Sequence, residues 1–325
     1  MRSFLAAAVV AAISTPALAD EALLGGRPFS PPGEVMTMPA TWMERWIKRP
    51  PDVDLALAID QQIYPAILPL VQRFAKDNRL KIAMVEGTCG VASGALAEKS
   101  ADVTGMCCPP GPLDRLPGVR YHTLGISSIA LIVNPSNPLA DVTLTQARSL
   151  FGGDIRNWGD LPVGGYSSGQ GDGVQAITRL HCKPRPGHWR LLLDNEDLFS
   201  PEARDVPAIR DMIAAVARTR SAVGYETLWH VADNARAGKV KALRLNGVDP
   251  ADVGAVARGK YPLYRVMNLT TWETGLPANP IADRLVEWLV ANAPMIDPVF
   301  GIVPASALRA NGWKFAGNEL VGEPR

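Results

Sequence analysis

The sequence predicts an α/β protein in which mostly parallel sheets are flanked by helices, and three observations support this fold class. From Val53 onward, segments with the periodicity of strands alternate with segments that have the periodicity of helices, which is the pattern of β-α-β units. The chain has 325 residues, which is enough for two domains of ordinary size. Apolar residues make up 47% of the chain and charged residues 20%, so each domain can bury a core.

The elements follow one another with recognisable start and stop signals. In the segment 63–78, apolar residues recur at helical spacing. Thr88 and Thr143 are suited to cap two further helices, and Gly152 with Gly153 ends the second of them. The predicted strands are 53–59, 80–87, 101–106, 128–135, 174–181, 222–228 and 261–272. The predicted helices are 63–78, 88–100, 143–153, 186–199, 209–218 and 279–292.

The N-terminus has the features of an export signal. Arg2 supplies a positive charge, residues 5–13 form an apolar run too short to span a bilayer, and 17–19 read Ala-Leu-Ala, a typical cleavage site. We expect residues 1–19 to be a signal peptide cleaved after Ala19, which would place the mature protein in the periplasm. The alternative is a buried N-terminal helix. The periplasm is oxidising and therefore permits disulfides.

Residues 20–52 are rich in proline and contain one short amphipathic piece around Trp42 and Trp46. We expect an N-terminal extension here rather than part of the first sheet. The net charge of +1 gives no electrostatic footprint for nucleic acid, so we expect no nucleic-acid partner.

Several stretches resemble the periplasmic phosphate-binding proteins of ABC transporters. The run "SIALIVNPSNPLADVTLTQARSLFGGDIRNWGDL" (128–161) has that family's strand, its N-P-x-N-P turn, its T-L-x-Q helix and its F-x-G-x-I-x-N-W motif. "AVGYETL" (222–228) and "RGKYPLYRVMNLTT" (258–271) are similar to two later segments of the family, and the likeness covers roughly residues 53–320.

The resemblance implies a two-lobed periplasmic-binding-protein fold of type II, with a mixed, mostly parallel sheet in each lobe and the ligand in the cleft between them. It implies that residues 53–125 and 266–325 form lobe 1 and that residues 126–265 form lobe 2. The lobes would close over the ligand by a hinge motion. The protein would then be a monomer without a cofactor or enzymatic activity. Its partner would be an ABC permease or, alternatively, a membrane sensor kinase.

The resemblance also implies where the ligand binds, and two of the four family loops lie in the first half of the chain. The first loop reads Ile-Asp-Gln-Gln and contains Asp60 and Gln61. A carboxylate there would repel a phosphate dianion, unless Asp60 only caps the next helix and faces water. The second loop contains Thr88, Cys89 and Gly90, and a thiol in the first turn of a helix is expected to have a lowered pKa.

The other two family loops also differ from the phosphate pattern. The third segment of the family carries a proton-accepting Asp, and "DVTGMCCPP" places Cys107 at that position and Cys108 after it. The fourth loop keeps a glycine, Gly187, but has lost the hydroxyl side chains. The candidate side chains in and near this loop are Arg179, His181, Cys182, Arg185 and His188. Tight binding of orthophosphate is therefore not expected.

All four cysteines align with segments that border the same cleft, which leaves two interpretations open. Two disulfides are possible, with Cys107 and Cys108 pairing outward to Cys89 and Cys182, because a bond between adjacent cysteines is strained. Alternatively, Cys89, Cys107, Cys108 and Cys182 with His181 could bind copper, zinc or arsenite, since thiolates prefer soft ions. An enzyme is disfavoured because no C-x-x-C string occurs, and "GYSSG" (165–169) lies in a glycine- and serine-rich loop (164–173) rather than at a strand-to-helix turn.

Overall fold

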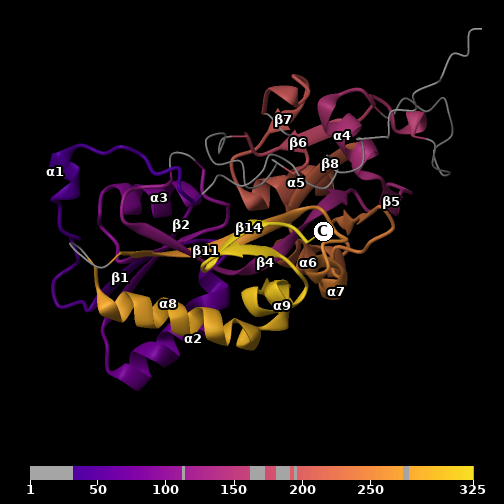
Figure 1. Cartoon of the computed structure of the whole chain (residues 1–325). Coiled ribbons are helices and arrows are strands. Elements are labelled where there is room, and N and C mark those ends of the chain that lie inside the picture. Colours follow the sequence, from indigo (N-terminus) through magenta and orange to yellow (C-terminus); the bar gives the residue numbers. More distant parts are fainter. Residues whose placement is uncertain are drawn as a thin grey trace, which may run out of the picture.

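Two long strands run through the middle of the molecule and join its two halves (Figure 1). β4 (Val119–Val133) and β11 (Tyr264–Trp272) pair in antiparallel fashion, and β11 is buried along its whole length. They lie at the centre of a ten-stranded sheet with the order β2-β1-β3-β11-β4-β8-β6-β7, in which β12 and β9 also pair with β4. The computed structural model describes residues 32–111, 114–161, 173–180, 191–193, 196–273 and 278–324.

The first half contains the parallel strands β1 (Leu55–Asp60), β2 (Ile82–Gly87) and β3 (Val103–Met106). Two helices, α2 (Tyr64–Asn78) and α8 (Pro280–Asn292), pack on one face of these strands through the apolar positions of their inner sides. The predicted helical spacing in 63–78 is confirmed, since its periodic apolar residues are the buried ones. The helix α3 (Cys89–Ala97) contacts β1 and β3 from the other side.

The second half is built around β8 (Ala222–Thr227) and β6 (Gln175–Thr178), which are parallel. The short strands β5 (Asp141–Val142), β7 (Arg204–Asp205), β9 (Lys241–Ala242) and β10 (Arg244–Leu245) extend it. The helices are α4 (Leu144–Gly152), α5 (Ile209–Arg218), α6 (Leu228–Arg236) and α7 (Val253–Ala257). Its core includes Phe151 and Tyr225, whose rings meet edge to face at 5.5 Å.

The C-terminal segment returns to the central strand. β12 (Ile302–Pro304) pairs with β4, α9 (Ala305–Ala310) follows, and the hairpin β13 (Lys314–Ala316) and β14 (Glu319–Gly322) contacts β4. A buried ion pair between Arg115 and Glu319, 2.6 Å apart, fastens this hairpin to the segment that follows β3. Short 3-10 turns occur at Trp158–Asp160, Glu196–Leu198, Ala293–Met295 and Pro298–Phe300.

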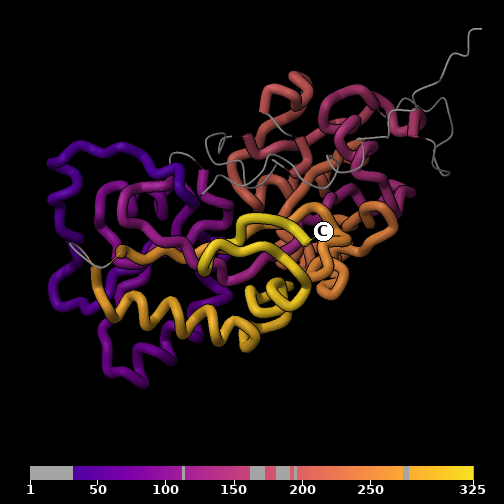
Figure 2. The backbone as a smooth tube through the Cα atoms, viewed as in Figure 1, coloured from indigo at the N-terminus to yellow at the C-terminus, as the bar shows by residue number. Residues whose placement is uncertain are grey.

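The segment 32–52 runs along the outside of the first half, as Figure 2 shows in indigo. Its only regular element is α1 (Ala40–Met43). Trp42 is buried under the ammonium group of Lys99, which lies 4.2 Å from the centre of the indole ring. Arg49 forms a bidentate pair with the buried carboxylate of Asp102. These contacts attach the extension to the end of α3 and the start of β3.

Most predicted elements are confirmed within one to three residues, and two need correction. The predicted strand 128–135 is only the second half of β4, which begins at Val119. The predicted helix 186–199 is wrong where it is described, because residues 191–193 form a turn and Glu196–Leu198 a single 3-10 turn. Its remaining residues, the predicted signal peptide 1–19 and residues 20–31 of the extension lie outside the described residues. No helix in the described ranges is long and apolar enough to cross a membrane.

Candidate functional site

Three parallel strands of the first half end at the same edge of the sheet, and the candidate residues follow these ends. Asp60 at the end of β1 is in register with Gly87 at the end of β2, and Ile59 is in register with Gly105 of β3. Ligands of open α/β sheets bind at this carboxyl edge. The connections leaving it carry Asp60 and Gln61, then Thr88 and Cys89, and then Cys107 and Cys108.

Cys89, Cys107 and Cys108 form a compact cluster of sulfur atoms, which we call the thiol triad. The Sγ atom of Cys89 lies 3.0 Å from that of Cys107 and 3.8 Å from that of Cys108, and the last two are also 3.8 Å apart. Each side chain is at most 5% exposed. A disulfide bond is about 2.05 Å long, so no two of these three sulfurs are bonded to each other.

Local sequence explains how Cys89 reaches the cluster. Thr88 adopts the extended N-cap conformation and accepts a hydrogen bond from the Val91 N–H at 3.4 Å, which confirms the predicted start of α3. Gly87 is required before it, because a Cβ atom there would lie 2.6 Å from the Cβ of Val91. The chain can therefore turn sharply from β2 into α3 and direct Cys89 toward the ends of β1 and β3.

The expected low pKa of Cys89 is wrong. Hydrogen bonding to Cys107 and Cys108, together with burial, raises the pKa of the Cys89 thiol well above its usual value. The pKa of Cys108 is also raised, chiefly by its contact with Cys107. The position at a helix N-terminus is outweighed because the neighbouring sulfurs would repel a thiolate and little solvent reaches it.

Asp60 is buried beside the thiol triad and does not face water, so the solvent-exposed alternative is wrong. Its side chain is 2% exposed and accepts a hydrogen bond from the Gln62 N–H at 2.8 Å. Burial, reinforced by Cys107, raises the pKa of the Asp60 carboxyl well above its usual range. Asp60 therefore closes the end of β1 and lies among groups that disfavour a further negative charge.

The second half contributes a buried network of charges. Arg179, which follows β6, pairs with Glu226 of β8 at 2.6 Å, and Arg265 of β11 pairs with the same carboxylate at 2.9 Å. All three side chains are at most 3% exposed. A guanidinium nitrogen of Arg265 lies 3.7 Å from the sulfur of Cys107. This contact brings the polar groups of the two halves together in one site.

Several buried polar atoms near these strand ends have no hydrogen-bond partner among the described residues. They are both amide atoms of Gln62, the Oγ1 atom of Thr178, the Nε atom of Arg179 and the Nε2 atom of His230. An unsatisfied buried polar group costs about 1–3 kcal/mol, and such groups are rare in folded proteins. Other described residues, such as Arg120 and Asn137, also have such atoms, but Gln62, Thr178 and Arg179 lie at the carboxyl ends of β1 and β6, where a polar ligand would satisfy them.

The remaining predicted residues are more peripheral or lie outside the described residues. Thr88 and Gly90 are exposed. Gln61 lines a hollow of about 630 Å³ together with Arg210 of α5, His230 of α6 and Lys239, which follows α6. His181, Cys182, Arg185, Gly187 and His188 are outside the described part of the chain, so their position relative to the triad stays a prediction.

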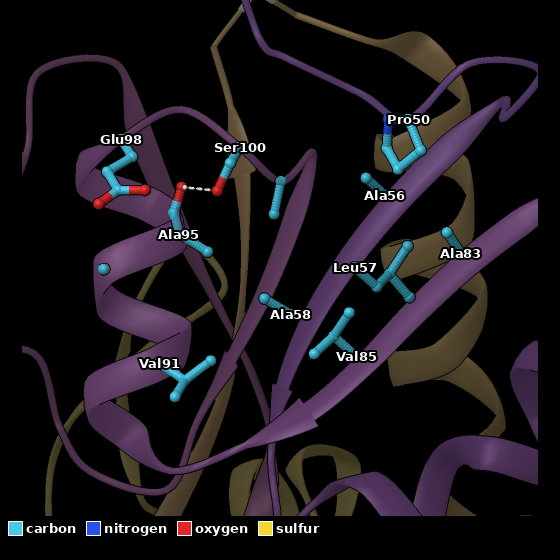
Figure 3. A pocket seen from close by; sticks show the side chains of 12 residues that line it. Pro50, Ala56, Leu57, Ala58, Ala83, Val85, Val91, Ala95, Glu98 and Ser100 are labelled. Atoms are coloured by element: carbon cyan, nitrogen blue, oxygen red, sulfur yellow. Dashed lines mark hydrogen bonds between the residues drawn. The ribbon is translucent and has the colours of Figure 1, made fainter.

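A second hollow, of about 400 Å³, lies between α3 and the strands β1 and β2 (Figure 3). Small apolar side chains such as Ala56, Ala58 and Ala83 line it, and the Ser100 hydroxyl at its rim donates to the Ala95 carbonyl. It offers few groups that could hold a polar solute. The chemistry of the chain is therefore concentrated at the sheet edge and not in this hollow.

Comparisons with known proteins agree with the fold and with the resemblance noted in the sequence. No family model matches the chain. It is 25% identical to the phosphate-binding protein PstS of Bacillus subtilis over 217 residues, which cover 65% of this chain and 67% of that protein. It is 25% identical to protein SphX of Synechococcus elongatus over 296 residues, covering 80% and 83%.

A solved structure extends this similarity to the fold. The ABC-type phosphate transport receptor from Vibrio cholerae superposes with a TM-score of 0.58 at 18% identity, covering 74% of this chain and 95% of that one. The chain therefore has the two-lobed α/β fold of periplasmic phosphate-binding proteins of ABC transporters. The predicted fold class and the predicted resemblance are confirmed.

Proposed function

We propose that this chain is an exported solute-binding protein that captures a small polar ligand between its two halves and delivers it to an ABC permease. The observation that carries this proposal is the presence of buried, unsatisfied polar atoms at the carboxyl ends of β1 and β6, in particular the complete amide of Gln62. A ligand that hydrogen-bonds to these atoms would remove their desolvation penalty. The similarity to phosphate-binding proteins supports the same role.

The solute differs from orthophosphate, or orthophosphate binds only weakly. Arg179 and Arg265 share the carboxylate of Glu226, so much of their positive charge is already balanced. Asp60 and the thiols occupy the strand ends of the first half, where they offer a dianion little stabilisation. A desolvated dianion needs more positive charge than this arrangement supplies.

Isothermal titration calorimetry with inorganic phosphate tests this proposal on the mature protein. We expect no binding in the submicromolar range, while a screen of small polar solutes by thermal shift identifies one that raises the melting temperature. Submicromolar phosphate binding would contradict the proposed specificity. Failure of every solute to stabilise the protein would contradict the capture role itself. Pull-down with an ABC permease of the same organism would then test delivery. Binding to a membrane sensor kinase instead would indicate a signalling role.

A further inference from the structure

The thiol triad has the arrangement of a three-coordinate binding site. We propose that Cys89, Cys107 and Cys108 together bind one trivalent metalloid, taken up as its neutral hydroxide (arsenous acid is the simplest probe), and that this is the ligand the two halves enclose. The proposal rests on the solute-binding role proposed above and names its ligand class.

The geometry supports a single central atom. Bonds of about 2.3 Å, the length of a metal–thiolate bond, hold three sulfurs roughly 3.3–4.0 Å apart for bond angles between roughly 90° and 120°. The separations in the triad are 3.0, 3.8 and 3.8 Å. All three sulfurs lie within 4.8 Å of one another, so small side-chain adjustments would bring each one into bonding range.

The three ligands come from rigid positions. Cys89 opens α3 behind the Thr88 cap, and the other two follow β3 directly. The carbonyl of Cys108 accepts a hydrogen bond from the side-chain amide of Asn268 on β11 at 3.2 Å, which fixes this turn. Preformed ligands on helices and strands lose little conformational freedom on binding, and this favours affinity.

Charge selects a metalloid hydroxide over a metal cation. A divalent or monovalent cation with three thiolates leaves a net negative complex, and the protons of the thiols must be expelled into a buried site. The nearest described cations, Arg265 and Arg179, already share Glu226. Zinc additionally prefers four ligands, whereas the group of potential ligand residues that the described chain brings together contains only these three cysteines.

The binding reaction balances without any change of charge. Three S–H bonds and three As–O bonds break, while three As–S bonds form and three water molecules leave, each carrying one thiol proton. Arsenic remains trivalent, and no oxidant or reductant is needed. Because neutral thiols react with a neutral hydroxide to give a neutral product, burial of the site does not oppose the reaction.

The test uses the mature full-length protein, purified anaerobically and titrated with arsenite. Native mass spectrometry should show one adduct whose mass gain equals one arsenic minus three hydrogens, and X-ray absorption at the arsenic edge should show three sulfur neighbours and no oxygen. A disulfide that includes any triad residue in the isolated protein, whether within the triad or to Cys182, or an adduct with fewer than three sulfurs, would overturn the proposal. So would preferential binding of zinc or copper(I) in direct competition.

Variants identify the ligands. Cys89→Ser, Cys107→Ser and Cys108→Ser should each lose the three-sulfur adduct. Cys182→Ser tests whether the fourth cysteine also takes part: an unchanged three-sulfur adduct supports a site made of the triad alone, and its loss contradicts one. Melting curves test whether each variant is folded. If one is not, the X-ray absorption of the unaltered protein still shows whether arsenic has three sulfur neighbours.

Failure of this inference and failure of the proposed function give different results. If arsenite forms no adduct but another solute stabilises the protein, the ligand assignment is wrong and the capture role remains. If arsenite binds through three sulfurs but the radius of gyration does not change, the triad is a thiophilic site and capture by closure is wrong.

Discussion

Among single residues, Glu226 controls how much positive charge the site presents. Its carboxylate receives Arg179 from one side and Arg265 from the other, and none of the three side chains is more than 3% exposed. Replacing it with glutamine would leave the buried guanidinium groups of Arg179 and Arg265 without the carboxylate that they share. We expect Glu226→Gln to lower the free energy of unfolding by about 3–5 kcal/mol, measured by urea denaturation.

The same substitution should change how the protein responds to anions. Phosphate should raise the melting temperature of Glu226→Gln more than that of the unaltered protein. The reason is that the ion can replace the lost carboxylate as the negative partner of the two arginines. The exposed Glu287, which takes part in no described ion pair, is the matched control, and Glu287→Gln should change neither property. Equal phosphate responses in all three proteins would show that Glu226 does not limit anion binding.

His122 gives the protein a defined pH dependence. The Asn318 amide lies 3.2 Å from Nδ1 and can only donate there, so Nε2 carries the proton and donates to the Thr271 hydroxyl at 3.0 Å. Burial, with a smaller contribution from Arg120, lowers the pKa of His122 from 6.5 to about 4. Protonation of Nδ1 would place two donors against each other.

The sign of the pH effect follows from these two pKa values. Above pH 6.5 the imidazole is neutral in both states, and between pH 6.5 and about 4 only the unfolded chain binds the proton. The stability is therefore complete above pH 6.5 and decreases by about 3 kcal/mol as the pH falls to 4. In His122→Gln this decrease should be smaller by that amount, measured by urea denaturation at several pH values. Identical pH profiles would contradict the assignment.

Sequence reasoning found the residues of the site that lie in recognisable loops and missed those inside strands. The convergence of Cys89, Cys107 and Cys108 was predicted because each aligns with a family loop that borders one cleft, and the structure places all three where β2 and β3 end at the same sheet edge. Arg265 and Glu226 were not predicted, since both lie within apolar segments that indicate strands. A charged residue inside a strand that is expected to be buried could have indicated the site, because a buried charge requires a buried partner of opposite charge.

At the scale of elements, Trp42 is the one buried side chain of the described extension, residues 32–52. Trp42 is 5% exposed, and its indole N–H donates to the Ala97 carbonyl at 2.6 Å, whereas Trp46 is 64% exposed. We expect Trp42→Ala to lower the free energy of unfolding by about 3–5 kcal/mol, and Trp46→Ala to change it by about 0.5 kcal/mol or less. Thermal and urea denaturation measure both. Similar effects of the two substitutions would mean that the extension is not docked as described.

The prediction of elements failed where the local pattern and the tertiary setting disagree. β4 begins at Val119, but its first residues include the polar side chains of Arg120 and His122. They interrupt the apolar pattern, so the sequence predicted only the second half of the strand. The segment 191–193 is apolar enough for a helix, but it forms a turn whose three leucine side chains are part of the core of the second half. Periodicity detects an amphipathic face, and it is uninformative where a segment is covered from all sides.

At the scale of the whole molecule, both connections between the halves pass through one irregular place in the sheet. The pairing of β4 and β11 shifts register between Met267 and Asn268, opposite Thr123 and Gly125. Gly125 is also in close contact with β12, since a Cβ atom there would lie 2.3 Å from the Val303 carbonyl oxygen. A bulge beside a glycine bends a sheet more easily than a regular ladder. The lobe boundaries that the family resemblance implies, after residues 125 and 265, lie beside this place in the sequence.

We therefore expect a bound ligand to close the halves about this bulge while the two crossing strands stay paired. Small-angle scattering of the mature protein should show a smaller radius of gyration with ligand than without it. Hydrogen exchange should leave the amides of β4 and β11 protected in both states, because the strands bend without separating. Slowed exchange should instead appear in the connections that carry Asp60, Thr88 and Cys107, which the opposite half covers on closure. An unchanged radius with saturating ligand, or loss of protection along β4, would contradict a hinge at this position.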